Sequence, residues 1–147
     1  MLPKWHAFWG LIFVGLFKIL VPESDYISLF LIFFAAVFID FDHYLATGLK
    51  TKKWGIRHAI KQNYEGRQQL VELKKTKDIC KKGDFHIFHT IEAHLFIGII
   101  GLFFAPFFFI MIGMFFHSIL DIIWMVRHDL IHAREFFLFN KLRSVFF

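Results

Sequence analysis

The sequence has a single cysteine, three prolines and long stretches without charged residues. The one cysteine, Cys80, excludes an internal disulfide and says little about the compartment. The first apolar run is followed by Val21-Pro22-Glu23-Ser24, which lacks the small residues of a signal-peptide cleavage site. We therefore expect this run to remain as a transmembrane helix. The sequence shows no internal repeat or low-complexity linker, so a single membrane domain over residues 1–147 is predicted.

Apolar and aromatic residues are abundant. The chain is 57% hydrophobic, contains 23 Phe, and has a mean hydropathy of +0.55. A soluble domain of this size could not bury so much apolar surface. The composition therefore predicts an integral membrane protein.

Four apolar segments are long enough to cross a bilayer. The region Phe85–Val126 is apolar over 42 residues. As one helix it would extend about 63 Å, twice the hydrocarbon thickness, so we divide it at Pro106. The predicted membrane helices cover about residues 5–21, 26–45, 85–104 and 107–126.

The basic residues predict the orientation of these helices. The loop 47–84 carries eleven Lys or Arg and four acids, which places it in the cytoplasm by the positive-inside rule. Four spans then put both termini in the cytoplasm, in agreement with the basic tail 127–147. We predict an all-α, integral membrane four-helix bundle, a multi-pass protein of the prokaryotic plasma (inner) membrane. We expect amphipathic helices in the loop, with the basic stretch 50–82 on the anionic inner leaflet. The alternative is that this loop forms a lid over a functional site. Nucleic-acid binding by the loop is possible but is not needed to explain its charge.

Histidines and carboxylates occur in all four predicted spans, each time in the half nearest the cytoplasm. An ionisable group in hydrocarbon is costly, so it usually has a partner and a function. Asp40 and His43 are three residues apart and His117 and Asp121 are four apart, spacings that share one helix face. His94 lies five residues after His89, about 140° round an ideal helix, so this pair must straddle a site or distort the helix.

Neutral imidazoles and carboxylates together suit zinc, with iron or manganese as alternatives. The candidate ligands exceed the four of one tetrahedral zinc, so either two ions bind or some carboxylates orient histidines. The predicted metal ligands are His6, Asp40, Asp42, His43, His89, His94, His117 and Asp121. Glu92 is the candidate general base, and Asp42 is a second catalytic candidate. His86, His128 and His132 are left open, and ordinary interfacial or hydrogen-bonded roles are the competing interpretation for every one of these residues.

The order of these motifs resembles the YdjM-like, membrane-bound metal-dependent hydrolases. The matching features are His6 in the first helix, Asp40-Phe41-Asp42-His43 ending the second, the His89-x4-His94 pair, and His117-x3-Asp121 in the last. The chain departs from the family at Ile39, where a Pro is usual, and between His89 and His94. The resemblance implies a metal centre formed by these residues and a hydrolase activity.

We therefore predict a metal-dependent hydrolase acting at the cytoplasmic leaflet on a lipid-like phosphoester or ester. A metal ion there would activate water and polarise a phosphoryl or carbonyl oxygen. One alternative is a di-iron membrane oxidoreductase of the desaturase or hydroxylase type, although that class has few aspartates. A metal or proton transporter would need polar groups through the full membrane depth. A haem protein held by paired histidines is the remaining alternative. The sequence does not fix the metal, the substrate or the oligomeric state.

Overall fold

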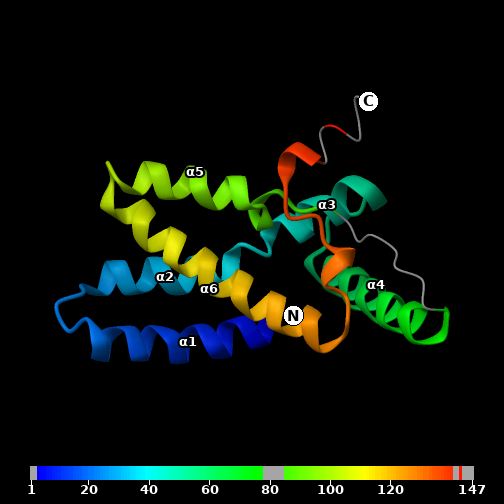
Figure 1. Ribbon diagram of the computed structural model, residues 1–147, viewed down its shortest axis with the longest axis horizontal. Coiled ribbons are helices and arrows are strands. Elements are labelled where there is room, and N and C mark those ends of the chain that lie inside the picture. The colour runs from blue at the N-terminus through cyan, green and yellow to red at the C-terminus, as the bar shows by residue number, and fades with distance from the viewer. Residues whose placement is uncertain (1–2, 78–84, 141–142, 144–147) are drawn as a thin grey trace. The chain divides into compact units, whose positions relative to one another are not determined.

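The computed structural model describes residues 3–77, 85–140 and 143 (Figure 1). All regular structure in these ranges is helical, which confirms the predicted all-α class. The chain divides into two compact units: unit 1 is Met1–Ile39 with Glu92–Asp121, and unit 2 is Asp40–Ile91 with Ile122–Phe147. The structure thus adds an internal division to the single domain predicted. Residues 78–84, 141–142 and 144–147 of the predicted loop and tail lie outside the described residues.

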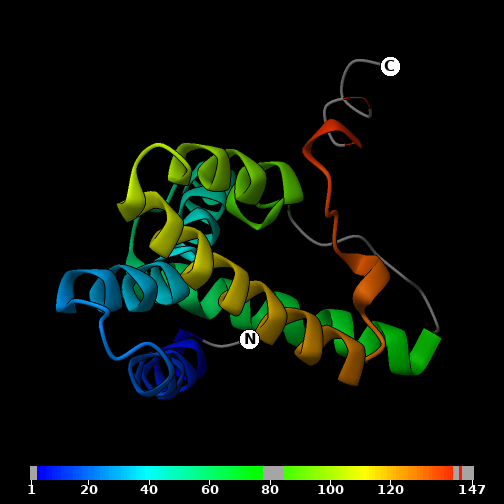
Figure 2. The same cartoon turned by 60° about the vertical axis from the view of Figure 1, so that its left-hand side comes forward.

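Unit 1 contains two helices that lie side by side, α1 (Pro3–Leu20) and α2 (Tyr26–Phe38), joined by a short turn (Figures 1 and 2). Lys18 Nζ donates to the backbone carbonyls of Pro22 and Ser24, at 2.6 and 2.8 Å. Asp25 caps α2, because its carboxylate accepts the backbone N–H and the hydroxyl of Ser28, both at 2.8 Å. These bonds satisfy polar groups that the helix ends would otherwise leave exposed.

The second predicted helix, 26–45, is interrupted. Residues 39 and 40 form a turn between α2 and α3 (Phe41–Thr51), and the N–H of His43 donates to the carbonyl of Asp40. The apolar pattern could not show this break, because neither Pro nor Gly marks it. As a result, Asp40 begins a new helix, and Asp42 and His43 lie in its first turn.

The third predicted helix, 85–104, is shorter at both ends. A 3₁₀ turn, η1 (Ile87–His89), precedes α5 (Ile91–Gly101), and Thr90 between them is extended. The Thr90 hydroxyl donates to the carbonyl of Ile87, and the N–H of Ile91 donates to the carbonyl of Phe136. The i to i−4 hydrogen bonds of an α-helix therefore do not continue from η1 into α5.

The fourth predicted helix, 107–126, is observed as α6 (Ala105–Arg127). Pro106 lies in its first turn, where the missing N–H costs nothing, and the chain reverses just before it. The predicted turn at this proline is therefore displaced by a few residues. In unit 1 the packing against α2 is close: a Cβ at Gly113 would collide with the carbonyl oxygen of Ile32. Ala35, Ile39 and Met114 form the adjoining core.

Unit 2 contains α3, a single long helix α4 (Ile56–Lys77), η1, the end of α6 and the short turn η2 (Ile131–Ala133). The predicted helical character of the loop is confirmed within the described residues. Lys52, at φ 59°, ends α3 in the left-handed conformation. The core of the unit is formed by Met125, Leu130 and Ala133, against which Leu70 and Val71 of α4 pack.

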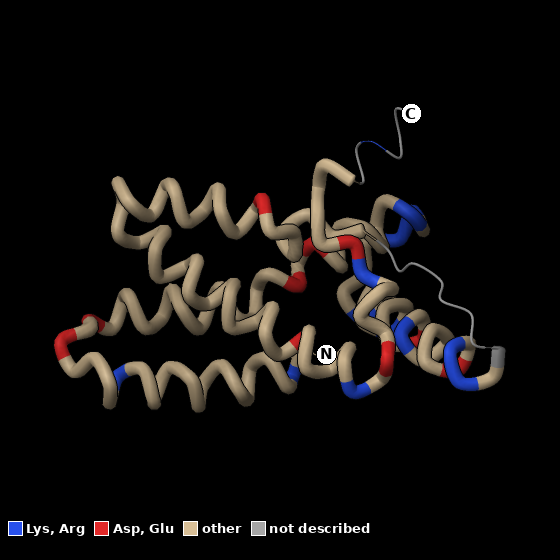
Figure 3. The backbone as a smooth tube through the Cα atoms, in the orientation of Figure 1, with Lys and Arg blue, Asp and Glu red and all other residues tan. Residues whose placement is uncertain are grey.

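Two helical stretches, Tyr26–Thr51 and Ala105–Arg127, are long and apolar enough to cross a membrane, and Ile91–Gly101 is a shorter apolar helix. The helices of unit 1 leave large apolar side chains exposed on their surfaces, including Leu11, Phe30 and Phe96. Charged residues are sparse along them (Figure 3). This exposure favours lipid contact over an aqueous surface. The four-span count and the cytoplasmic termini stay predictions.

Candidate metal centre

Three of the predicted ligands meet in unit 1. His6 of α1 lies against His117 and Asp121, which are one turn apart on α6. Nε2 of His6 is 3.3 Å from Oδ1 of Asp121, and Nε2 of His117 is 3.7 Å from its Oδ2. The two imidazoles stack with ring centroids 3.7 Å apart, and all three residues are buried. We call His6, His117 and Asp121 the unit 1 group.

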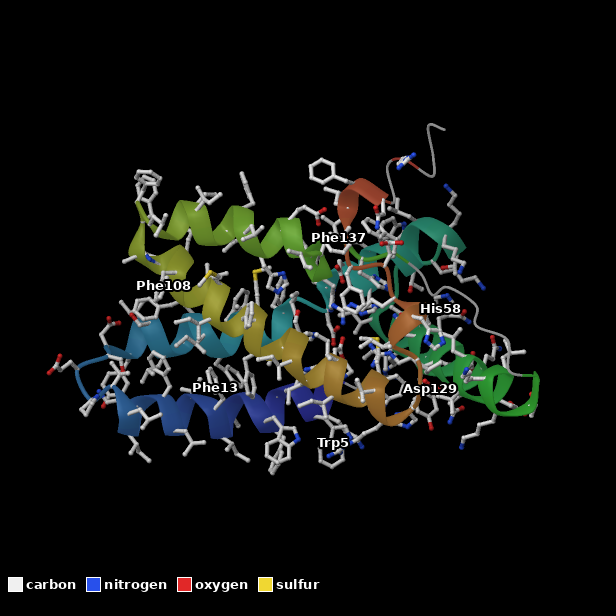
Figure 4. All side chains as sticks on the ribbon, viewed as in Figure 1. Trp5, Phe13, His58, Phe108, Asp129 and Phe137 are labelled. Atoms are coloured by element: carbon white, nitrogen blue, oxygen red, sulfur yellow. The ribbon has the colours of Figure 1, made fainter. Side chains whose placement is uncertain are left out.

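Aromatic packing sets the register of α1 against α6. Phe13, labelled in Figure 4, stacks on Phe116 with ring centroids 4.1 Å apart. Phe13 is two turns from His6, and Phe116 adjoins His117. This stacked pair therefore holds the two helices at the offset that brings the two histidines together.

The hydrogen bonding of His117 indicates how its ring is oriented. Nδ1 lies 2.8 Å from the backbone carbonyl of Ala36, which can only accept, so Nδ1 carries a proton and donates it. In the neutral ring, Nε2 then presents its lone pair toward Asp121. A lone pair and a carboxylate oxygen facing each other repel unless a cation lies between them.

Five residues form a second cluster, in unit 2, around the start of α3 and the turn η1. His43 Nε2 is 3.2 Å and His89 Nε2 is 3.6 Å from Oδ1 of Asp40. Asp42 lies beside His89 and His86, with its Oδ1 3.7 Å from His86 Nδ1. We call this set the unit 2 group: Asp40, Asp42, His43, His86 and His89.

His89 repeats the arrangement of His117. Its Nδ1 is 3.1 Å from Oδ2 of Asp42, so the N–H donates to the carboxylate and Nε2 is directed at Asp40. The same Oδ2 of Asp42 accepts the backbone N–H of Phe88 at 3.1 Å. Arg134 Nη2 donates to the backbone carbonyl of His89 at 3.2 Å. The ring of His89 is therefore fixed from both its side chain and its backbone.

His86 was left open by the sequence, and the structure brings it into the unit 2 group. One donor atom each from Asp42, His43 and His86 lie within 4.8 Å of one another. Burial, together with the neighbouring imidazoles of His43 and His89, lowers the pKa of His86 to about 2. Its ring is therefore neutral at physiological pH, the form that binds a metal ion.

Two predicted site residues lie outside both groups. His94, buried in α5, shares a hydrogen bond with Ser118 Oγ at 3.1 Å. Glu92 lies in the first turn of α5 and is half-buried. For His89 and His94 the sequence left two alternatives, a straddled site or a distorted helix, and the structure has an extended Thr90 between η1 and α5.

Of the remaining histidines, His128 and His58 have local partners, whereas His132 is exposed. His128 Nδ1 lies 2.8 Å from the carbonyl of Trp124, and its ring stacks on that indole. His132 is exposed in η2, beyond the end of α6. His58 of α4 is bonded to Thr51 (Figure 4).

The separations within each group suit a shared cation. Zinc bonds of about 2.0–2.1 Å in a tetrahedral arrangement place neighbouring donor atoms about 3.3–3.4 Å apart. The four imidazole-to-carboxylate separations given above for Asp40 and Asp121 lie between 3.2 and 3.7 Å. The two longest exceed an ordinary N–H···O hydrogen bond. The buried His and Asp residues can therefore hold a metal ion, and a single centre for all eight predicted ligands stays a prediction.

Sequence reasoning did not identify the groups that hold His89 and His117, which are Arg134 and the carbonyl of Ala36, nor Ser118, the partner of His94. No pattern marks them, because each acts through a contact between segments distant in the sequence. Comparison with protein-family models, with curated proteins and with solved structures finds no match.

Proposed function

We propose that this chain is a membrane-embedded, metal-dependent hydrolase that acts at the cytoplasmic leaflet on a lipid-like phosphoester or ester. The proposal has two parts, a metal centre and a hydrolytic reaction. The metal part is supported by geometry within each unit, and the reaction by the chemistry such a centre provides and by the motif resemblance.

The observation that carries the metal part is the shared arrangement of His117 and His89. Each donates Nδ1–H to an oxygen and directs Nε2 at a carboxylate oxygen, at 3.7 and 3.6 Å. Histidines that bind metals typically donate the other ring N–H to a carbonyl or a carboxylate. Finding the arrangement once in each unit argues against a chance contact.

The residues then have distinct proposed roles. Two sets of residues would each hold a divalent ion, with zinc the preferred metal. The set in unit 1 is His6, His117 and Asp121, and the set in unit 2 is Asp40, His43 and His89. Such an ion lowers the pKa of water and polarises a phosphoryl or carbonyl oxygen. Asp42 holds the ring of His89 through Oδ2. Glu92 is the proposed acceptor of a proton from water, since it is a half-buried carboxylate on the helix that follows η1.

Metal content tests the first part. We expect the protein, purified in detergent without chelators, to contain at least one equivalent of zinc by plasma mass spectrometry. His117→Ala and His89→Ala should each lower that content, whereas the exposed-residue control His132→Ala should not. If both variants retain stoichiometric metal, the assignment of His117 and His89 as metal ligands is wrong.

Turnover tests the second part. Reconstituted protein should release product from one of a panel of lipid-linked phosphoesters and carboxylic esters, and Glu92→Gln should slow this release while leaving bound metal unchanged. Two irons per chain with oxygen-dependent turnover would instead identify an oxidoreductase. Metal uptake into proteoliposomes, lost in Asp121→Ala, would identify a transporter.

A further inference from the structure

The first two turns of α4 and the link before them leave four large apolar side chains exposed. Trp54, Ile56, Ile60 and Tyr64 are 53%, 69%, 48% and 44% exposed. The last three are four residues apart, so they lie within about 80° of one helix face. Farther along α4, Leu70 and Val71 pack in the core of unit 2. The exposed apolar residues are therefore confined to the beginning of the helix.

The same segment is uniformly basic. Residues 50–64 contain five Lys or Arg and no acid: Lys50, Lys52, Lys53, Arg57 and Lys61. In Figure 3, where Lys and Arg are blue, blue segments occur at the end of α3 and along α4. We call the four exposed apolar residues together with these five cations the α4 patch.

Local contacts hold the α4 patch in place. The indole of Trp54 lies against Gly48 of α3, where an added Cβ would come within 2.6 Å of the ring. The Tyr44 hydroxyl donates to the carbonyl of Trp54 at 2.8 Å, and His58 is bonded to Thr51 at 3.2 Å. The link between α3 and α4 is thus tied to α3, and the apolar residues are presented by a packed element.

We propose that the α4 patch binds the surface of an anionic lipid bilayer, with Ile56, Ile60 and the edge of Trp54 inserted among the acyl chains. Exposed aliphatic residues beside Lys and Arg are the features of a helix lying in a membrane interface. Each Lys or Arg near an anionic surface strengthens binding about fivefold. A nucleic-acid surface would use the same charges but has no place for two exposed isoleucines.

The position of the α4 patch in the chain agrees with this partner. Along the chain, the patch begins at the end of the stretch Tyr26–Thr51, which is interrupted at residues 39 and 40 but is long and apolar enough to cross a membrane by its length and composition. Residues after a spanning helix lie at the membrane–water boundary, where Trp and Lys are favoured. This inference goes beyond the proposed hydrolase and uses none of the metal-binding residues.

A pair of labelled variants can test it in the full-length protein. Cys80→Ser removes the native thiol, and an environment-sensitive fluorophore is then attached through Ile60→Cys or through Gln62→Cys. Gln62 is exposed and lies about 200° round the helix from Ile60, so it is a matched control. Each protein is reconstituted into nanodiscs of phosphatidylcholine alone or with 30% phosphatidylglycerol, containing a lipid-attached spin-label quencher.

In anionic discs we expect at least a twofold higher quenching ratio at position 60 than at position 62. The difference should fall in phosphatidylcholine discs, in high salt, and in the triple variant Lys52→Gln, Lys53→Gln, Lys61→Gln. Equal quenching at both positions in anionic discs would overturn the proposal. So would a label at position 60 that stays in water in these discs and becomes shielded only when single-stranded RNA is added.

Discussion

Asp42→Asn is the substitution that most sharply separates an orienting carboxylate from a metal ligand. In the structure, Oδ2 of Asp42 accepts two N–H groups, from Phe88 and from His89 Nδ1, both at 3.1 Å. Asparagine keeps a carbonyl oxygen of the same shape but loses the charge. Removing such a partner of a ligating histidine typically weakens metal binding 10- to 100-fold, equivalent to about 1.4–2.7 kcal/mol. We expect a loss in that range.

The assay is a competition titration of zinc between the detergent-solubilised protein and a chelator of known affinity. Asp129→Asn is the matched control, because Asp129 is a surface carboxylate in the same unit that pairs with Lys74 at 3.2 Å. Asp129 has φ 52°, a conformation that asparagine tolerates. An unchanged zinc affinity in Asp42→Asn, or an equal loss in the control, would refute the reasoning. A loss beyond about 1,000-fold, well outside the range for an orienting group, would make Asp42 a direct ligand.

Three further predictions concern stability. Gly113→Ala should destabilise the protein by about 1–3 kcal/mol, because the added Cβ meets the carbonyl oxygen of Ile32. Gly15→Ala, which has open space around it, should stabilise the helix by about 0.5–1 kcal/mol. Thermal unfolding of the two variants tests this pair of predictions. Hydrogen bonds from Ser28 lower the pKa of Asp25. The ionised carboxylate therefore stabilises the folded state at pH values above the ordinary pKa of Asp, and this stabilisation is lost as the pH falls through the lowered pKa. Asp25→Ala should therefore lower Tm at pH 7 but not in acid, and Glu23→Ala should leave this pH profile of Tm unchanged. Chelation should lower Tm, and zinc at 100 times its Kd should restore about 2.7 kcal/mol; a Tm indifferent to both would argue against a metal bound to the folded state.

The sequence predicted the helical class because the apolar runs are long and contain few breaking residues. It missed the interruption at Ile39 and Asp40, which has no Pro or Gly. Between His89 and His94 it gave a distorted helix as one of two alternatives, without locating the extended Thr90. The extended Thr90 is followed by a contact from a distant segment, the bond from the N–H of Ile91 to the carbonyl of Phe136. Propensity within one segment cannot show such contacts.

The structure brings predicted site residues together where their spacing lies within one helix. His117 and Asp121, four apart on α6, both face a common point, as their spacing indicated. Around His89 the predicted helix 85–104 is replaced by η1 and a turn. That change directs His89 to Asp40 and Asp42 and brings in His86, three residues earlier. His94 instead bonds Ser118 within unit 1.

X-ray absorption at the zinc edge of the purified protein tests the metal centre most directly. The proposal predicts stoichiometric zinc with nitrogen and oxygen ligands at about 2.0–2.1 Å and the outer-shell scattering of imidazole. It also predicts that His117→Ala or His89→Ala reduces the imidazole signal, while His132→Ala leaves it intact. A protein that binds no metal after zinc loading, or whose zinc spectrum is identical in all three variants, would contradict the central claim.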